Sequence, residues 1–199
     1  MSKSSVVIFF PTFLECKKVL NISDFSLYNF FDTAQYKSIP VIITGAGKSN
    51  AAAVSALYFA EFKPKYPILA GICGAYQNTH IKTSDIVSID YDYFVDEANY
   101  NGTSITTIHE KGFAIAKDNR AEFHVDENYK IVSSNTVSLI PQFDSLSNLY
   151  MAKTNALVEN MEGAAFGMAA NKQGIKPYQI RAVSNYCGNT EKQQTEQKR

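Results

Sequence analysis

The sequence predicts an α/β protein whose central sheet is mainly parallel and covered by helices. Short runs of β-branched, aromatic and other apolar residues alternate with stretches that repeat apolar or small residues every three or four positions. Glycines mark junctions between these runs, at Gly45, Gly47, Gly71, Gly74 and Gly102. The chain has 199 residues, 45% of them hydrophobic, which suits one domain with a single core. In such a sheet, ligands bind at the carboxyl ends of the strands.

The expected strands are short apolar runs, at residues 6–10, 41–44, 68–70, 86–90, 131–133, 156–158 and 179–183. The expected helices lie between them, at residues 14–20, 50–59 and 163–173. Residues 91–128 have weaker periodicity and many polar side chains, so we expect a strand pair with a long active-site loop there. Because residues 190–199 contain almost nothing apolar to bury, we expect one domain over residues 1–189 and then a mobile polar tail.

The charge balance and the cysteines limit the partners and the compartment. Nineteen basic residues balance nineteen acidic ones, so no overall field attracts nucleic acid or an anionic membrane. The cysteines, Cys16, Cys73 and Cys187, are widely spaced, which fits reduced thiols better than disulfides or a zinc site. The apolar run 6–10 is too short to span a membrane. We therefore expect a cytoplasmic protein that recognises a small molecule at a local site.

The segment 44–49, Thr-Gly-Ala-Gly-Lys-Ser, contains the Gly-Lys-Ser sequence of a phosphate-binding P-loop. A P-loop also needs a glycine five positions before Gly47, and Ile42 stands there. The spacing therefore favours a tight turn from strand to helix. Glycine suits such a turn because it accepts a positive φ and lets a ligand approach the backbone.

Three polar residues follow expected strands and are candidates for a site: Glu15, Glu162 and Asn185. Glu15 falls in the first turn of a helix, where the helix dipole favours a glutamate without any function. Glu162 precedes Gly-Ala-Ala and could either cap a helix or accept two hydrogen bonds from a vicinal diol such as a ribose. The amide of Asn185 suits the edge of a 6-oxopurine, although asparagine is also an ordinary turn residue.

Other reactive side chains show no catalytic pattern. His80, His109 and His124 lack the spacing of metal ligands, and the chain has no Gly-x-Ser-x-Gly motif of a serine hydrolase. Cys73 stands two residues after one glycine and directly before another, and a small packing residue is favoured there over a nucleophile. We expect neither a metal nor an organic cofactor.

Five segments occur in one order along nearly the whole chain. They are Glu15 after the first strand, residues 44–48 (TGAGK), 71–75 (GICGA), 158–165 (VENMEGAA) and 180–185 (IRAVSN). In these segments the chain resembles the nucleoside phosphorylase/nucleosidase superfamily. The resemblance implies a three-layer αβα sandwich with a central, mainly parallel mixed sheet. It also implies a purine nucleoside as substrate, and a homodimer.

The resemblance assigns roles to seven residues. Glu15 would activate water and Asn185 would face the purine, as the catalytic residues. The substrate-binding residues would be Met161 against the sugar, Glu162 on the ribose hydroxyls, Gly74 in the second glycine turn, and Thr136 and Val137 beside the purine.

Two features of the chain then select a reaction. Phosphorylases of this fold hold phosphate with Arg and Ser groups, but residues 11–14 contain no arginine and Ile72 stands where a polar contact would be, which favours water as the nucleophile. Methylthioadenosine/S-adenosylhomocysteine nucleosidases have aspartic acid where this chain has Asn185, and asparagine cannot protonate adenine. The chain is in this respect similar to the futalosine hydrolases of the menaquinone pathway. We therefore expect hydrolysis of futalosine to hypoxanthine and dehypoxanthine futalosine.

Three alternatives stay open: a methylthioadenosine/S-adenosylhomocysteine-type nucleosidase, a purine nucleoside phosphorylase, and a non-catalytic nucleoside-binding protein. The third alternative, a non-catalytic protein, is based on a specific feature of the chain. The resemblance implies a terminal helix after the Ser-Asn strand, whereas this chain departs from the pattern after about residue 189 and continues as a polar tail.

Overall fold

The structure is a computed structural model that describes residues 4–140 and 143–188. The tail expected at residues 190–199 lies outside the described residues. The described strands are β1 (Val6–Phe10), β2 (Ser26–Tyr28), β3 (Phe31–Tyr36), β4 (Ile39–Ile43), β5 (Tyr66–Ala75), β6 (Ile86–Phe94), β7 (Ala98–Tyr100), β8 (Ile105–Thr107), β9 (Arg120–Glu122), β10 (Lys130–Thr136), β11 (Val158–Asn160) and β12 (Tyr178–Tyr186). The described helices are α1 (Phe13–Leu20), α2 (Lys48–Phe62), the 3-10 turn η1 (Lys117–Asn119), α3 (Asp144–Thr154) and α4 (Gly163–Asn171).

Among the described residues, ten strands form one mixed sheet in the order β11-β10-β6-β12-β5-β1-β4-β3-β2, with β9 paired to β6. Its centre is parallel: β4, β1, β5 and β12 run in one direction, as do β6, β10 and β11. Antiparallel pairs join β12 to β6, add β3 and β2 at one edge, and attach β9 to β6. The expectation of a mainly parallel mixed sheet is confirmed for this core.

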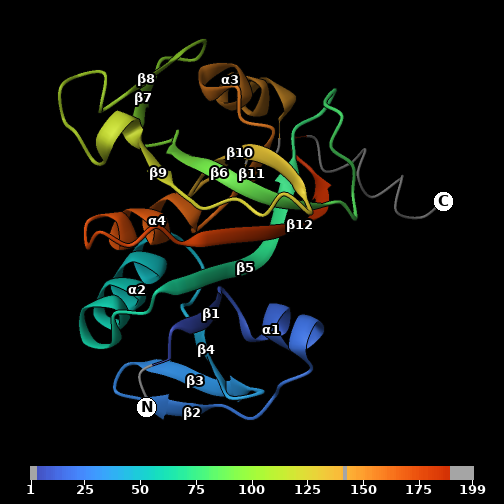
Figure 1. The fold of residues 1–199 in the computed structure, drawn as a ribbon. Coiled ribbons are helices and arrows are strands. Elements are labelled where there is room, and N and C mark those ends of the chain that lie inside the picture. The colour runs from blue at the N-terminus through green and yellow to red at the C-terminus, as the bar shows by residue number, and fades with distance from the viewer. Residues whose placement is uncertain (1–3, 141–142, 189–199) are drawn as a thin grey trace.

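Strand β11 closes one end of the sheet on itself, because it pairs with both β10 and β5. Glu159 of β11 lies opposite Gly74 of β5, and Asn185 of β12 lies beside the same glycine. The carboxyl ends of β5, β10 and β12 therefore meet around β11 (Figure 1).

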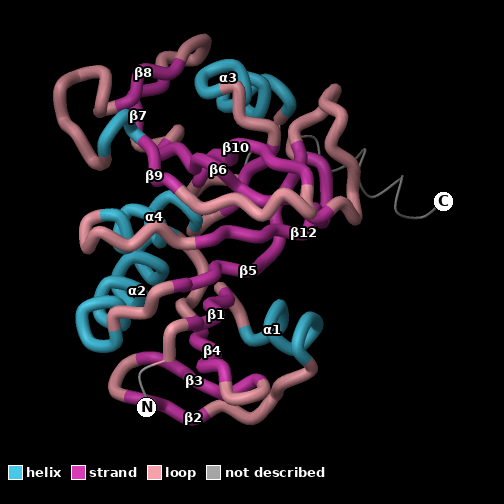
Figure 2. Tube along the Cα trace, in the orientation of Figure 1, coloured by secondary structure: helices cyan, strands magenta, loops and turns pink. Residues whose placement is uncertain are grey.

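Helices cover both faces of the sheet, which gives the three expected layers (Figure 2). On one face α2 and α4 pack against β1, where the rings of Phe59 and Phe166 meet Phe9 edge to face at 5.5 and 5.1 Å. On the other face α1 packs over β1 and β4, with Cys16 against Phe10. Helix α3 forms a third apolar cluster with the ends of β5 and β10. No described helix is long and apolar enough to cross a membrane.

Two glycine positions differ from the expectation. Gly71 and Gly74 lie inside β5 and not at a strand-to-helix junction. Gly71 is needed for space, because a Cβ atom there would come within 2.6 Å of Arg181 Nη1 and 3.0 Å of Glu15 Oε1. Gly102 lies in the β7–β8 hairpin, which is the strand pair expected within residues 91–128.

The strands β2, β3 and β9 and the helix α3 are absent from the sequence prediction. The turns that join β2, β3 and β4 use Asn29, Lys37 and Ser38 at φ values of 55°, 46° and 67°. Lysine rarely adopts a positive φ and is not a typical turn residue, so Lys37 gives no turn signal in the sequence. Helix α3 buries only Ser147 and Tyr150, so it lacks a broad apolar stripe.

Candidate active site

A cavity of about 290 Å³ lies where β5, β11 and β12 meet the first turns of α1 and α4. It is lined by Pro11, Thr12, Leu14, Glu15, Ala46, Ile72, Cys73, Gly74, Val137, Ile140, Glu159, Asn160, Met161, Glu162, Ser184 and Asn185. Six of the seven residues predicted for the site are among them, and Thr136 is the exception. Segments that are far apart in the chain therefore meet in one cavity.

Glu15 is held at the rim of this cavity by the start of α1. Thr12 is the N-cap residue, and its hydroxyl accepts from Glu15 N at 3.2 Å and donates to Glu15 Oε2 at 2.6 Å. The other oxygen, Oε1, accepts from the backbone N–H of Ile72 at 3.0 Å. The placement of Glu15 in the first turn of a helix is confirmed. Beyond a capping role, the carboxylate reaches across to β5 and is fixed by donors from two elements.

Glu162 is buried at the start of α4, where it occupies the N-cap position. Its side chain caps no backbone group of its own helix. Oε1 accepts from the N–H of Gly47 at 3.0 Å, and Oε2 accepts from Arg181 Nη1 at 3.3 Å. The carboxylate thus bonds the Gly45–Gly47 turn and Arg181 and no N–H group of its own helix, so the helix-capping interpretation is wrong.

Arg181 connects the carboxylates of Glu15 and Glu162, and the sequence analysis assigned it no role. It is fully buried in β12 and donates from Nη1 to Ile72 O at 3.2 Å and from Nη2 to Asn160 Oδ1 at 3.0 Å. Ile72 in turn holds Glu15 through its N–H. The available signal was a cation between the apolar residues Ile180 and Ala182 of an expected strand, since buried charges are nearly always paired.

A buried polar network supports the loop before α4. Asn160 Oδ1 accepts from the N–H groups of Glu162 and Gly163 at 2.9 and 2.6 Å, and its Nδ2 donates to Asp92 Oδ2 at 2.6 Å. Burial raises the pKa of Asp92, and hydrogen bonds from Thr136, Asn160 and Gln179 oppose that rise. The network fixes the backbone that carries Glu162.

Thr136 belongs to this network and does not line the cavity. Its side chain is fully buried; its hydroxyl donates to Asp92 Oδ1 at 2.7 Å and accepts from the N–H of Ala164 at 2.8 Å. The neighbouring Val137 does line the cavity. The strand period of two explains the difference, because successive side chains point to opposite faces.

Asn185 and Gly74 lie side by side on β12 and β5 and both line the cavity. Asn185 Oδ1 accepts from Ser184 Oγ at 2.7 Å, and its Nδ2 donates to Tyr186 O at 3.0 Å. These bonds orient the amide and leave one N–H and one lone pair for a ligand. Cys73, beside Gly74, is 3% exposed, and burial raises the pKa of its thiol to about 12. A thiol in that state is not a nucleophile near neutral pH.

Glu159 is a lining residue that the sequence analysis did not assign. Its side chain is only 6% exposed, and burial raises its pKa to about 7. Hydrogen bonds from Tyr76 and Cys187 partly oppose this rise. The signal in the sequence was an acidic residue inside the apolar run that precedes Met161.

The charged side chains that line the cavity are all acidic. Three carboxyl groups, Glu15, Glu159 and Glu162, line it, and no lysine or arginine of the described chain does. Lys48, from the segment that resembles a P-loop, is instead paired with Asp96 at 2.5 Å and with Glu97 at 3.3 Å. Such a cavity favours a neutral ligand or one that gains positive charge, and disfavours a free anion.

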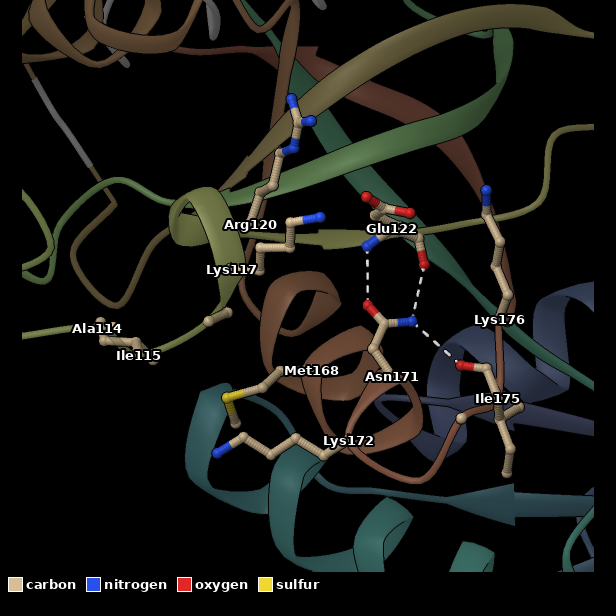
Figure 3. A pocket seen from close by; sticks show the side chains of 12 residues that line it. Ala114, Ile115, Lys117, Arg120, Glu122, Met168, Asn171, Lys172, Ile175 and Lys176 are labelled. Carbon is tan, nitrogen blue, oxygen red and sulfur yellow. Dashed lines mark hydrogen bonds between the residues drawn. The ribbon is translucent and has the colours of Figure 1, made fainter.

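A larger cavity of about 670 Å³ lies at the carboxyl end of α4 (Figure 3). Four cationic side chains stand around it, Lys117, Arg120, Lys172 and Lys176, against the single carboxylate of Glu122. None of the residues predicted for the site lies there. Its positive field would oppose positive charge on a reacting sugar, so the smaller cavity is the better candidate for glycosidic chemistry.

The described residues contain no group of three or more His, Cys, Asp or Glu side chains that could hold a metal ion.

Comparison with protein families gives one match: the family model described as the Phosphorylase superfamily matches residues 29–199. None of the curated proteins matches the chain.

Solved structures show the same fold at low sequence identity. A 5′-methylthioadenosine/S-adenosylhomocysteine nucleosidase from S. pneumoniae, with a transition-state inhibitor, is 18% identical with a TM-score of 0.74, covering 94% of this chain and 88% of that one. The corresponding nucleosidase from Colwellia psychrerythraea 34H, in complex with adenine, is 18% identical with a TM-score of 0.74, covering 96% and 86%. A futalosine hydrolase mutant of Helicobacter pylori strain 26695 is 13% identical with a TM-score of 0.72, covering 92% and 86%.

Proposed function

The chain belongs to the phosphorylase superfamily, and from this premise we propose that it hydrolyses the N-glycosidic bond of futalosine, giving hypoxanthine and dehypoxanthine futalosine. The observation that carries the proposal is the composition of the smaller cavity. Carboxylates fixed by backbone donors and an asparagine amide line it together, and no cationic side chain of the described chain lines it. These groups suit a nucleoside whose sugar becomes positively charged as the bond breaks.

Glu162 is the proposed anchor of the ribose. A carboxylate can accept two hydrogen bonds from neighbouring hydroxyl groups, and here the ion pair with Arg181 at 3.3 Å orients it. Met161 lines the cavity next to it and would lie against the sugar. The negative charge also stabilises an oxocarbenium-like transition state.

Glu15 is the proposed base that takes a proton from water. Its carboxylate is held from two sides, by the hydroxyl of Thr12 and by the N–H of Ile72. A general base needs to lie within hydrogen-bond reach of the water that it activates, and fixed donors keep the carboxylate in one orientation. The attack would come from the rim at α1, with Glu162 holding the sugar in place.

Asn185 is the proposed contact to the departing purine. Ser184 and Tyr186 O fix its amide, so that one N–H remains free to donate. That N–H can reach N7 or the carbonyl oxygen of a 6-oxopurine and stabilise negative charge on the leaving base. An amide cannot give up a proton, which favours hypoxanthine over adenine as the leaving group.

Water is preferred to phosphate as the nucleophile because of the side chains that line the cavity near Glu15. Phosphate requires cationic or hydroxyl donors, but Ile72 and Leu14, which are 50% and 61% exposed, stand on the Glu15 side of the cavity. The nearest guanidinium, Arg181, is already engaged with Glu162, Asn160 and Ile72.

The proposal includes a homodimer. Leu139, Ile140 and Phe143 are 60%, 58% and 74% exposed, and Ile140 lines the cavity. Clustered exposed apolar side chains are typical of interaction surfaces. Sedimentation of the purified protein measures the state directly.

The test is release of free base from four nucleosides: futalosine, inosine, methylthioadenosine and aminodeoxyfutalosine. Each is assayed with and without phosphate. We expect futalosine to be cleaved fastest, at the same rate in both buffers. Dependence on phosphate with formation of a sugar 1-phosphate would identify a phosphorylase, and preference for methylthioadenosine would identify the adenine-releasing class. Binding of the nucleosides without turnover would identify a non-catalytic member.

A further inference from the structure

Lys48 stands at a position of α2 where local electrostatics do not favour a lysine. It is the first residue of the helix, and the first turn contains no acidic side chain. The partial positive charge of a helix N-terminus disfavours a cation there. The N-cap residue, Gly47, offers no side chain to cap the helix. Contacts with distant segments must therefore stabilise Lys48 in this place.

Those contacts are made with two acidic residues shortly after β6. Lys48 Nζ lies 2.5 Å from Asp96 Oδ1 and 3.3 Å from Glu97 Oε1. The side chains of Lys48 and Asp96 are only 13% and 9% exposed, so solvent screens their attraction less than that of a surface pair. The other oxygen of Asp96, Oδ2, accepts from the N–H of Ser138 at 2.5 Å. One carboxylate thus joins the start of α2 to the segment that follows β10.

The start of α2 also holds the carboxylate proposed to bind the ribose. Gly47 directly precedes Lys48, and its N–H donates to Glu162 Oε1 at 3.0 Å. Movement of the helix start would move this donor, and Glu162 could then turn about its remaining bond to Arg181. A displacement of about 1 Å in a positioned group can cost about 100-fold in rate.

The segment that follows β10 also borders the smaller cavity. Val137, which lines that cavity, directly precedes Ser138. Lys48 and Asp96 do not line the smaller cavity. They line a neighbouring hollow of about 540 Å³, which shares Met161 with it. The ion pair therefore lies directly behind backbone groups that shape the smaller cavity.

We propose that Lys48 and Asp96 are positioning residues for the reaction. Their ion pair fixes the N–H of Gly47 against Glu162 and so orients the carboxylate for the ribose hydroxyl groups. This inference rests on the proposed function. An ion pair that only stabilised α2 would leave the recognition of the ribose unchanged, and this difference can be measured.

The test measures the preference for a ribose hydroxyl group. The substrates are the purine nucleoside cleaved fastest in the panel above and the 2′-deoxy analogue of that nucleoside. A hydrogen bond to a charged group contributes about tenfold or more, so the unmodified protein should prefer the ribose by at least about that factor.

Lys48→Met removes the charge and keeps the length of the side chain. We expect its kcat/KM for the ribose nucleoside to fall by about 10–100-fold, and its preference over the deoxy analogue to fall at least about threefold. Lys48→Arg keeps the cation and should restore most of both. Lys111→Met, at an exposed lysine, is the matched control and should change neither.

Asp96→Asn tests the other partner. Asparagine keeps an oxygen that can accept from the N–H of Ser138, but it loses the charge that attracts Lys48. We expect the same loss of ribose preference as in Lys48→Met. The double variant should be no worse than either single variant, because both remove one interaction. If Lys48→Met does not fold, Asp96→Asn supplies the same measurement.

Variants that lose activity or stability but keep the full ribose preference would overturn the inference, because a structural ion pair predicts that result. Losses that add in the double variant would also contradict it. A loss confined to nucleosides with a large 5′ substituent would mean that Lys48 contacts the substrate in the neighbouring hollow, and positioning would be wrong.

Failure of the proposed function gives a different result. If the unmodified protein cleaves no nucleoside of the panel, the proposed function fails and the inference fails with it. An active protein without any ribose preference would remove Glu162 as the anchor of the sugar. An active protein whose ribose preference survives in both single variants removes only the role of Lys48 and Asp96.

Discussion

Arg181 and Glu162 form an ion pair shielded from water, with 3.3 Å between Nη1 and Oε2 and side chains that are 0% and 6% exposed. The same guanidinium donates to the carbonyl oxygen of Ile72, whose N–H holds Glu15. The two carboxylates proposed to act on the sugar and on water are therefore coupled through the backbone of one residue, Ile72, and one buried cation.

Loss of Arg181 should destabilise the protein strongly. Arg181→Ala leaves Glu162 buried without its cation, which costs about 3–5 kcal/mol of unfolding free energy. Urea unfolding measures the change. The double variant with Glu162→Gln should recover part of it, since no unpaired charge remains. Losses that simply add in the double variant would contradict a direct coupling between the two side chains.

Gly71→Ala tests the tight packing between β5 and the two carboxylates. The added Cβ would meet Arg181 Nη1 at 2.6 Å and Glu15 Oε1 at 3.0 Å, although the backbone at this position suits alanine. We expect a loss of roughly 1–3 kcal/mol in stability and a clear fall in kcat with little change in far-UV circular dichroism. A variant with normal kcat would show that the positions of Arg181 and Glu15 are not critical.

Glu15→Gln should retain ligand binding and lose most turnover. Glutamine keeps an oxygen that can accept from the N–H of Ile72, but it cannot take a proton from water. We expect kcat to fall by about 10²–10⁴-fold while hypoxanthine still binds, as isothermal titration calorimetry would measure. Glu61→Gln serves as the control for the same change on the surface. Near-normal hydrolysis by Glu15→Gln would remove Glu15 from the mechanism.

Asn185→Asp should move the preference toward adenine-bearing nucleosides. A carboxylic acid can give adenine the proton that an amide withholds. The ratio of kcat/KM for methylthioadenosine to that for futalosine should rise at least about tenfold, equivalent to roughly 1.4 kcal/mol. An unchanged ranking of the nucleosides would mean that other groups determine the base.

Glu159 should make stability depend on pH. Burial raises its pKa in the folded protein from 4.5 to about 7, so the folded state binds the proton more tightly than the unfolded state does. Stability is therefore highest below pH 4.5 for this group, falls as pH rises to about 7, and is constant above that. The difference corresponds to about 3 kcal/mol.

Comparing the protein with Glu159→Gln at pH 5 and pH 8 isolates this contribution, because the other titrating groups are common to both. We expect the variant to be relatively more stable at pH 8. Parallel stability curves over that range would show that Glu159 is ionised in both states.

Much of the fold was accessible from the sequence because it depends on local patterns. The apolar runs of β1, β5 and β12 and the small residues of α4 have the periods of strands and helices. The strand β3 was missed because its turn into β4 uses Lys37 and Ser38 at positive φ, a conformation that accompanies the pairing of β3 with β4. Thr136 was expected beside the purine, but alternation along β10 directs it into the buried network of Asp92.

The sequence by itself determined the α/β class, the order of the elements and the polar residues that follow them. Periodicity and short motifs are properties of neighbouring residues, so they can be recognised without knowledge of distant contacts. Only the tertiary structure decided how these residues act on one another. It paired Glu162 with Arg181, tied Glu15 to Ile72, and placed Glu159 in a buried cluster with Tyr76 and Cys187. Burial and hydrogen bonding between distant segments set the ionisation of a side chain, and no local pattern contains that information.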